Sequence, residues 1–296
     1  MSAGIAIIPT VESAIEIPSA LSGAFRARAR EANKYTVGTV AVIGGSERFP
    51  HAPVFAALGA RTAGAGLIRL VIPEASRFAA AQHVPEATLA RLGEEELPPR
   101  ADVCVAGMGL GLSASTEAVV RRLLLGGEGR FVIDADALTV LAGRGGLERQ
   151  EGRSLVLTPH EGEAARLLGT SGAQVRADRL SAARELAARY GATVVLKGPG
   201  TLVVSADGRR VYENAAGNPY MALGGMGDLL AGVIGARWAY LGPDAFLAAA
   251  GGVWLHSLAS DRVVAAGKDP SVVGTAAELG GVRVRLDSGC ASEGRV

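Results

Sequence analysis

Short apolar runs without polar alternation recur along the chain, and each ends in glycine or a polar residue. The run 39–43, for example, reads Thr-Val-Ala-Val-Ile and is followed by Gly44-Gly45-Ser46. Continuous apolar strands bounded in this way are typical of a parallel sheet covered by helices on both faces. The strands expected on this basis are 39–43, 67–72, 102–106, 130–133, 154–157 and 193–197.

Helical patterns lie between and after these strands. Alternating strands and helices predict right-handed crossovers and an α/β fold with a doubly wound sheet. Two further strands, 201–205 and 210–213, flank Asp207-Gly208 and are expected to form a hairpin. The expected helices are 12–30, 52–65, 74–81, 115–125, 161–168, 175–190, 228–240, 243–266 and 274–280.

No linker divides the chain, so we expect one domain over residues 1–296. Within it, 1–33 is expected to be an N-terminal helix and linker, and 283–296 a polar tail. A hydrophobic content of 49% is ample for one large core, and 20% charged residues is ordinary for a protein in water.

Composition also argues against several classes of partner. The net charge is +1, and no basic block is interleaved with aromatic residues, so nucleic acid is not expected to bind. No signal-peptide pattern or membrane-length apolar run is present, so no membrane partner is expected either. The two cysteines, Cys104 and Cys290, do not suggest a disulfide framework, which favours a cytoplasmic location.

The stretch 224–228, Gly-Gly-Met-Gly-Asp, stands just before an apolar helix. Glycines let the backbone approach a ligand closely, and a helix start offers free N–H groups to an anion such as phosphate. Asp228 then has two interpretations. It either caps or charges the first helical turn, or it removes a proton from a hydroxyl group that faces the phosphate.

Further candidate residues follow several of the predicted strands. Glycine after a strand is ordinary turn chemistry when taken alone. In open parallel sheets, however, ligands bind at the carboxyl ends of the strands, so these residues are expected to share one cleft. They are Gly44-Gly45-Ser46, the glycines of 107–111, Asp134, His160 and Lys197.

Taken together, five motifs resemble those of the ADP- or ATP-dependent NAD(P)H-hydrate dehydratases of the ribokinase-like superfamily. The resemblance runs from about Lys34 to Leu279 and implies a three-layer α/β/α fold. It also implies a repair reaction in which a hydrated NADH or NADPH is dehydrated while ADP or ATP is consumed, releasing AMP or ADP and phosphate. The motifs are Gly44-Gly45-Ser46, Asp134-Ala-Asp136, Leu157-Thr-Pro-His-Glu-Gly-Glu163, Lys197-Gly-Pro-Gly-Thr201, and Gly217-Asn-Pro through Gly224-Gly-Met-Gly-Asp228.

The resemblance also implies roles for individual residues. The adenine nucleotide would be held by Lys197, Gly198, Pro199, Gly200, Thr201 and Gly227. The hydrate would be held by Ala52, Gly109, His160 and Asp228. The anion hole would be formed by Gly225, Met226 and Gly227. Relatives are commonly tetramers, so a homo-oligomer is expected.

Asp228 would act as the general base, and Mg²⁺ would bridge the nucleotide phosphates. Related sugar kinases often carry Asn-x-x-Glu where this chain reads His160-Glu-Gly-Glu163, so Glu163 is the candidate for the shell of the metal. Glu163 could equally be a glutamate favoured by the dipole of a helix start, and His160 could equally be a helix cap.

The chain departs from the family pattern at three positions. His51 stands where glycine is common and would place a bulky side chain near the substrate pocket. Met108 replaces a proline, and Leu223 replaces threonine or valine. These departures concern the rim of the site and leave Asp228 unaffected.

Three rival functions remain open from the residues. A dinucleotide dehydrogenase would use Gly107-x-Gly-x-Gly111 and Asp134, but the third glycine is misplaced for the usual fingerprint. A kinase for small-molecule hydroxyl groups would share the anion hole and the base, and would release a stable phosphate ester. A nucleotide-binding module without turnover would not need Asp228. By residue type alone, Lys197 could also be a solvated turn lysine.

Overall fold

The computed structural model describes residues 15–94, 96–125, 128–145 and 150–289. Its strands form one sheet in the order β3-β2-β1-β4-β5-β6-β7-β8-β9. The strands are β1 Thr39–Ile43, β2 Leu67–Ile72, β3 Thr88–Arg91, β4 Val103–Ala106, β5 Gly129–Ile133, β6 Arg153–Leu157, β7 Thr193–Leu196, β8 Leu202–Val204 and β9 Val211–Glu213.

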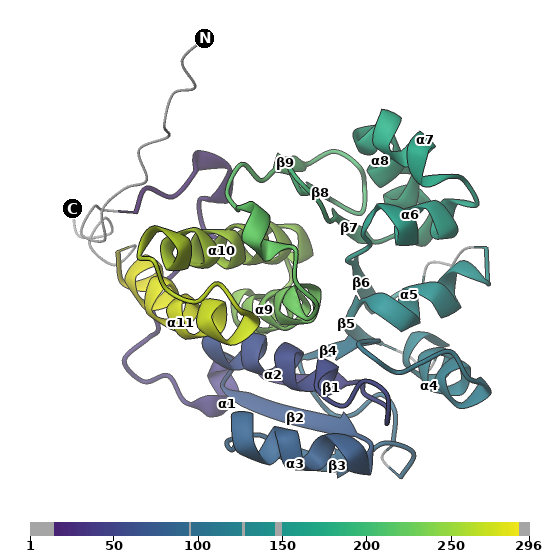
Figure 1. Ribbon diagram of the computed structural model, residues 1–296, viewed down its shortest axis with the longest axis horizontal. Coiled ribbons are helices and arrows are strands. Elements are labelled where there is room, and N and C mark those ends of the chain that lie inside the picture. The colour runs from purple at the N-terminus through teal and green to yellow at the C-terminus, as the bar shows by residue number, and fades with distance from the viewer. Residues whose placement is uncertain (1–14, 95, 126–127, 146–149, 290–296) are drawn as a thin grey trace.

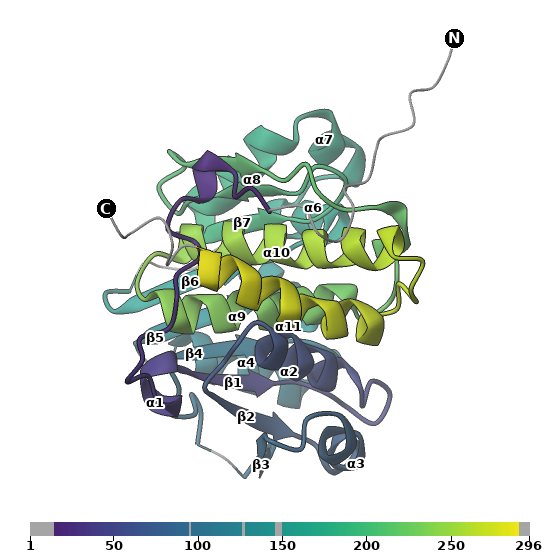
Figure 2. The same cartoon turned by 90° about the vertical axis from the view of Figure 1, so that its left-hand side faces the viewer.

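Strands β1 to β7 pair in parallel, and β8 and β9 complete the sheet as an antiparallel hairpin. The chain order reverses at β1, which pairs with β2 on one side and β4 on the other: Val40 lies opposite both Ile68 and Val103. Figure 2 shows the parallel strands pointing to one side of the molecule. Such a reversal opens a crevice at the carboxyl ends of the two central strands.

Helices cover both faces of the sheet. In Figure 1, α2, α9, α10 and α11 lie on one side, and α4, α5, α6 and α8 lie on the other. The helices are α1 Lys34–Val37, α2 Ala52–Thr62, α3 Glu74–His83, α4 Ala114–Leu125, α5 Ala135–Ala142, α6 Glu161–Leu168, α7 Gly172–Ala177, α8 Arg179–Tyr190, α9 Met226–Leu241, α10 Ala245–Ala265 and α11 Val272–Gly289, with 3-10 turns η1 Ser19–Leu21 and η2 Pro219–Met221. None of the described helices meets the length and hydropathy needed to cross a membrane.

The unalternating apolar strands are explained by these two layers. In β1, Val40 and Val42 pack into the core on the α9 side, whereas Ala41 and Ile43 pack into the core on the α4 side. Both faces of the strand exclude water, so both sets of side chains are apolar. This is the three-layer α/β/α arrangement that the sequence predicts.

Helices α2 and α9 cross at very short range, which fixes where α9 begins. A Cβ atom at Gly232 would lie 1.8 Å from the carbonyl oxygen of Ala56, and one at Gly59 would lie 2.1 Å from that of Leu229. Only glycine permits this approach of the two backbones. The start of α9, which carries Asp228, is thereby set against α2.

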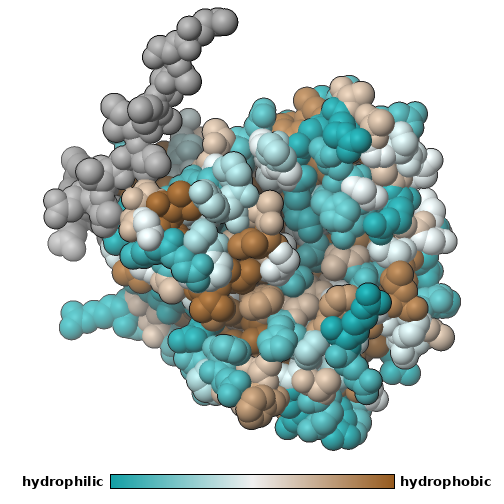
Figure 3. All heavy atoms as spheres, viewed as in Figure 1, coloured by the Kyte–Doolittle hydropathy of each residue, from teal (hydrophilic) through white to brown (hydrophobic). Residues whose placement is uncertain are grey.

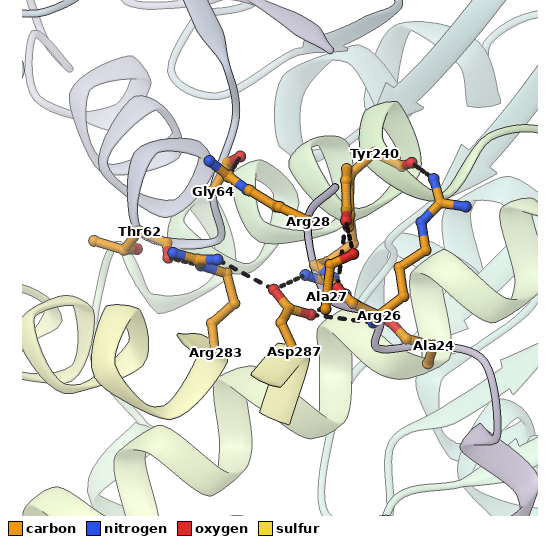
Figure 4. A network of polar contacts seen from close by, with 10 residues as sticks. Ala24, Arg26, Ala27, Arg28, Thr62, Gly64, Tyr240, Arg283 and Asp287 are labelled. Carbon is orange, nitrogen blue, oxygen red and sulfur yellow. Dashed lines mark hydrogen bonds and ion pairs between the residues drawn. The ribbon is translucent and has the colours of Figure 1, made fainter. Parts of the chain in front are cut away.

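A buried ionic network ties the N-terminal segment to the helices (Figure 4). Arg237 of α9 is 1% exposed and lies 3.1 Å from Asp287 of α11. Arg237 also donates to the carbonyl oxygen of Ala24, and the hydroxyl group of Tyr240 donates to that of Ala27. Arg283 forms a second ion pair with Asp287 at 3.1 Å. These side chains satisfy backbone groups of residues 24–27 that a helix would satisfy internally.

Two expectations about the chain ends are therefore wrong. Residues 15–30 contain only the short turn η1 and otherwise no helix, while residues 12–14 lie outside the described part. The predicted polar tail is wrong over 283–289, because α11 continues to Gly289 and buries Asp287. Residues 290–296 lie outside the described part.

Other differences are local. The predicted helix 175–190 is divided into α7 and α8 at Asp178, whose φ of −147° is not helical and whose carboxylate accepts the N–H of Ser181. The edge strand β3 and helices α1 and α5 were not predicted. The remaining predicted strands and helices are confirmed within a few residues, except that α11 is much longer than predicted.

Candidate active site

The predicted site residues gather at the carboxyl edge of the sheet. They come from the turns after β1, β4, β5, β6 and β7 and from the first turn of α9. Contacts between these turns divide the site into a side around Lys197 and a side around Gly109, described in turn below.

The turn after β7 has the compact form that its glycines predict. The N–H of Lys197 donates to the carbonyl of Pro159 at 2.8 Å, and the hydroxyl of Thr201 donates to the carbonyl of Gly198 at 2.9 Å. Gly198 and Gly200 have φ of +141° and +62°, values that side chains disfavour. The turn is thereby held against the end of β6.

Arg179, at the start of α8, braces the same turn and was not predicted from the sequence. Its guanidinium donates to the carbonyl oxygens of Pro199 at 2.9 Å and Leu196 at 3.1 Å. A Cβ atom at Gly198 would lie 2.9 Å from its Nη1 atom. An arginine opening a helix gives no sequence signal of this contact.

The Lys197 side chain turns inward and is not a solvated turn lysine. Its ammonium lies 2.8 Å from Asp134 and 3.8 Å from Glu163, and the side chain is only 18% exposed. Burial alone would lower the pKa of Lys197, but the carboxylates of Asp134 and Glu163 outweigh burial and raise it. The ammonium also lies 3.4 Å from where a Cβ atom of Gly227 would stand. A cation is therefore fixed beside the start of α9.

The start of α9 is shaped by Gly225, whose φ is +95°. A Cβ atom there would lie 2.6 Å from the ring of Phe55 in α2. The N–H of Met226 donates to the carbonyl of Leu223 at 3.3 Å, while that of Gly227 has no protein partner among the described residues. Of the three residues predicted for the anion hole, Gly225 and Gly227 thus each keep an N–H group that no protein group accepts among the described residues, and their role in binding an anion stays a prediction.

Asp228 lies in the first turn of α9 and is half-buried. Loss of water around the carboxyl group, together with the negative charge of Asp134, raises its pKa to about 7 from 3.8, and the ammonium of Lys197 opposes the shift. A carboxyl group with a pKa near neutrality is suited to accept and release a proton. An ordinary capping aspartate would have its pKa lowered instead.

His160 and Glu163 form a capping box at the start of α6. Nδ1 of His160 accepts the N–H groups of Gly162 at 2.9 Å and Glu163 at 3.3 Å, and Oε2 of Glu163 accepts the N–H of His160 at 2.8 Å. Both alternative interpretations, a helix cap and a helix-start glutamate, are thus realised. The substrate role of His160 and the metal role of Glu163 stay predictions.

The residues predicted to hold the substrate after β1 and β4 do lie together. A Cβ atom at Gly109 would lie 2.7 Å from Cβ of Phe49 and 3.0 Å from Cβ of Ala52. His51 precedes α2, is exposed and makes no capping hydrogen bond with its side chain. Met108, by contrast, is fully buried in the core and lies behind the rim.

The segment 214–221 is fastened to α10. The N–H of Gly217 donates to Asp261 at 2.8 Å, and the side-chain amide of Asn218 donates to Asp261 at 2.8 Å and to Ser260 at 3.1 Å. Tyr220, just after this anchor, is 59% exposed. Figure 3 shows apolar residues gathered on this face beside α11. The motif Gly217-Asn218 thus sets the path of the chain into α9.

A cavity of about 390 Å³ adjoins the Lys197 side of the site at Glu163; it is lined by Leu112, Ala135, Asp136, Thr139, Glu163 and Arg166. A larger one, of about 610 Å³, lies between the amino ends of β6 and β7 and the start of α10, at the opposite edge of the sheet. The smaller cavity is the relevant one here, because the candidate residues lie at the carboxyl edge.

The described residues hold no cluster of three or more His, Cys, Asp or Glu side chains arranged to bind a metal ion. Mg²⁺ commonly binds through one or two carboxylates together with substrate phosphates and water. The carboxylate of Glu163, beside Lys197, is of the kind that fits a metal carried by a nucleotide.

Comparison with known proteins assigns the chain to a family. The family model described as NAD(P)H-hydrate dehydratase matches residues 40–277. The ADP-dependent (S)-NAD(P)H-hydrate dehydratase of Neisseria meningitidis is 41% identical over 245 residues, which cover 81% of each chain. The chain spans about half the length of the bifunctional NAD(P)H-hydrate repair enzymes that it also matches, and 49% of the one from Gloeobacter violaceus.

Solved structures agree. The ADP/ATP-dependent NAD(P)H-hydrate dehydratase of Bacillus subtilis, crystallised with ATP and Mg²⁺, is 27% identical with a TM-score of 0.80, covering 89% of this chain and 95% of that one. A ribokinase-like superfamily protein of Enterococcus faecalis is 29% identical with a TM-score of 0.78, covering 92% and 93%. The fold is therefore ribokinase-like, and the chain belongs to the NAD(P)H-hydrate dehydratase family.

Proposed function

We propose that this protein is a hydro-lyase that dehydrates hydrated NADH or NADPH to NAD(P)H and consumes ADP or ATP in doing so. The observation that carries this function is the environment of Asp228. It is a carboxyl group with a pKa of about 7, in the first turn of a helix whose start holds a free N–H group and a buried ammonium. Phosphoryl transfer to a hydroxyl group needs a base and positive potential in this juxtaposition.

The reaction begins with transfer of the terminal phosphoryl group. Asp228 takes the proton of the substrate hydroxyl group. At the same time the hydroxyl oxygen bonds to the terminal phosphorus of the nucleotide, and the bond from that phosphorus to the bridging oxygen breaks. The leaving nucleotide is AMP from ADP, or ADP from ATP. The N–H of Gly227 and the ammonium of Lys197 stabilise the charge on the transferring group.

Elimination follows from the ester. The lone pair of the ring nitrogen expels phosphate as the carbon–oxygen bond breaks, and loss of a proton from the adjacent carbon restores the double bond. Phosphate leaves more readily than hydroxide at neutral pH, which explains why a nucleotide is consumed. Mg²⁺ bound to the nucleotide phosphates would neutralise part of their charge, with Glu163 as the candidate residue that reaches it through water.

The remaining site residues divide between the two ligands. Residues 197–201 hold the adenine nucleotide beside Gly227, which is supported by the compact turn that ends next to α9. Ala52, Gly109 and His160 hold the hydrate, which is supported by the contact between the turns after β1 and β4.

Two properties of the whole protein belong to the same proposal. The protein acts in the cytoplasm, where its nucleotide substrates occur, and it forms a homo-oligomer, with a tetramer as the expected size. Sedimentation velocity measures this size directly. A monomer at micromolar concentration would contradict the expected tetramer, but it would not contradict the proposed dehydratase activity.

The activity is tested by incubating the purified protein with NADH hydrate, Mg²⁺ and either ADP or ATP while following the absorbance of reduced nicotinamide. We expect absorbance to return only when a nucleotide is present, with one phosphate released per NADH formed. Accumulation of a stable phosphate ester would indicate a kinase instead. Hydride transfer without nucleotide consumption would indicate a dehydrogenase.

A further inference from the structure

Asp134 is a buried carboxylate that the reaction above does not use. It follows β5 and is 1% exposed. One oxygen, Oδ1, lies 2.8 Å from the ammonium of Lys197, and the other, Oδ2, lies 3.9 Å from where a Cβ atom of Gly227 would stand. A negative charge so close to a phosphate site needs an explanation, because by itself it would repel the nucleotide.

The backbone holds Asp134 from several directions. Its N–H donates to the carbonyl of Ala106 at 3.0 Å, and its carbonyl accepts the N–H of Ala137 at 3.2 Å. A Cβ atom at Gly107 would lie 1.9 Å from that carbonyl oxygen, so only glycine allows the turn after β4 to pack here. The next residue, Ala135, has the unusual φ of +50°. Asp134 is therefore a rigid point on the sheet edge.

We propose that Asp134 is a positioning residue that acts through Lys197. It holds the ammonium beside the start of α9, where the terminal phosphate arrives, and keeps the ammonium from pairing with Asp228. This inference rests on the proposed function, and it assigns to Asp134 no contact with either substrate.

The chemistry of lysine explains why such a residue is needed. The ammonium stands on a flexible four-carbon stem and has three donors. One donor is directed to Asp134, which leaves others for a phosphate oxygen. Without Asp134, the carboxylates that still act on this cation are those of Glu163 and Asp228. An ion pair with Asp228 would make that base a poor proton acceptor.

The charges around Asp228 support this balance. Carboxylates of Asp134 and Asp136 from the start of α5, and of Glu163 from α6, raise its pKa, while Lys197 from the turn after β7 lowers it. The negative charge of Asp134 repels ionised Asp228, and Asp134 also holds the ammonium of Lys197 away from it. Removal of the Asp134 charge reverses both effects, and each reversal lowers the pKa of Asp228.

The first test is Asp134→Asn, which keeps the shape of the side chain and removes its charge. We expect the dissociation constant for ADP, measured by titration calorimetry, to rise about tenfold, within the range for coupled neighbouring residues. The acidic limb of the pH profile of kcat/KM should move to lower pH. A residue that only supports the fold would not move that limb, and a residue that acts only through its charge would move the limb without weakening ADP binding.

Asp136→Asn is the matched control. Asp136 stands two residues away, carries the same charge and accepts the N–H of Gly111 at 2.8 Å, but has no contact with Lys197. Its ADP affinity should stay within about twofold of the parent. Equal loss of affinity in the Asp134→Asn and Asp136→Asn variants would overturn the positioning role, because general charge would then explain both.

The Asp134→Asn variant could fold poorly because it leaves the ammonium of Lys197 without its partner. The double variant Asp134→Asn/Lys197→Met avoids this, since neither member of the ion pair is then charged. If Asp134 acts through Lys197, this variant binds ADP as Lys197→Met does. A further tenfold loss would overturn the inference. Calorimetry needs no turnover, so a parent that binds ADP but does not restore NADH would contradict the proposed function, while these comparisons would still decide the role of Asp134.

Discussion

Asp228 has an environment that differs sharply from that of an ordinary carboxyl group. The loss of surrounding water and the charge of Asp134 favour its protonated form, so its pKa of about 7 lies well above the ordinary 3.8. A base of this kind is half ionised near pH 7. Binding a proton and releasing it therefore differ little in free energy at that pH. Two measurable consequences follow at the scale of this residue.

The first consequence is the pH dependence of the rate. Because the base must be ionised to accept a proton, kcat/KM should rise as pH increases through about 7 and level off above it. A series of initial rates from pH 5 to about pH 9 measures this limb. An acidic limb centred near pH 4 would mean that Asp228 titrates as an ordinary aspartate and would contradict the described environment.

The second consequence is a cost in stability. A carboxyl group whose folded pKa exceeds its unfolded pKa destabilises the fold at pH values above both, and this cost disappears as pH falls below the unfolded pKa. Asp228→Asn should therefore stabilise the protein at pH 8, by up to about 4 kcal/mol at about 1.4 kcal/mol per pH unit between 3.8 and about 7. At pH 3, below the unfolded pKa, the gain should nearly vanish.

Thermal unfolding of both proteins at the two pH values checks the sign. A lower melting temperature for Asp228→Asn at pH 8 would support the alternative of a stabilising helix-start charge, which contributes about 0.3–1 kcal/mol.

Two neighbouring glycines should respond differently to substitution. Gly227 has ordinary helical geometry, and a side chain there meets the Lys197 ammonium at 3.4 Å. Gly227→Val should therefore weaken ADP binding and leave the fold intact. Gly225→Ala should destabilise the fold, because φ is +95° and the ring of Phe55 is 2.6 Å away. Calorimetry and thermal unfolding of both variants separate these effects, and unchanged ADP affinity in Gly227→Val would remove Gly227 from the nucleotide site.

At this scale, the sequence identified the residues that belong to long motifs and missed those that act by contact alone. Asp228, Lys197 and Gly227 could be named as candidates because each stands in a conspicuous glycine-rich motif, and their roles stay predictions. Arg179 could not, because its role depends on carbonyl groups brought near by the turn after β7. The partnership of Asp134 with Lys197 joins two residues 63 positions apart and leaves no local pattern.

At the scale of elements, the ionic network around Asp287 explains why the N-terminal segment is not helical. Pro18 and Gly23 interrupt the expected helix 12–30, and Gly23 has a φ of +85°. Arg26 and Arg28 of this segment form contacts with α9 and with the turn at Gly64, respectively, instead of a helical face. Similarly, Asp287 stands in a polar stretch of the sequence that is typical of a tail, but it is buried in ion pairs with Arg237 and Arg283. Local breaks and partners from distant elements together decide such segments, and the partners cannot be seen in the sequence.

Removing Asp287 should be strongly destabilising. Asp287→Ala leaves Arg237 buried without its carboxylate, and loss of one member of a buried ion pair costs about 3–5 kcal/mol. Chemical denaturation measures this cost. The control is Glu185→Ala, which breaks the exposed pair with Arg189 in α8 and should cost about 0.3–0.5 kcal/mol. Equal small losses in the two variants would show that the network does not stabilise the fold.

At the scale of the whole molecule, the order of the strands could be only partly predicted. Unalternating apolar runs predict a parallel sheet with two covered faces, and the structure confirms this prediction. The reversal of order between β1 and β4 follows from packing across the complete sheet, and no short segment encodes it. The same reversal brings Ala52 next to Gly109 and places both near the helix that carries Asp228.

The central claim is that this site phosphorylates the hydroxyl group of the hydrate, from which phosphate is then expelled, and that Asp228 is the base for the phosphoryl transfer. The most direct measurement compares the parent and Asp228→Asn in restoring NADH from NADH hydrate with ADP and Mg²⁺, at pH 8. We predict that turnover falls by about 10² to 10⁴, the usual effect of losing a positioned base, while ADP affinity is retained. An Asp228→Asn protein that restores NADH at close to the parental rate would contradict the mechanism.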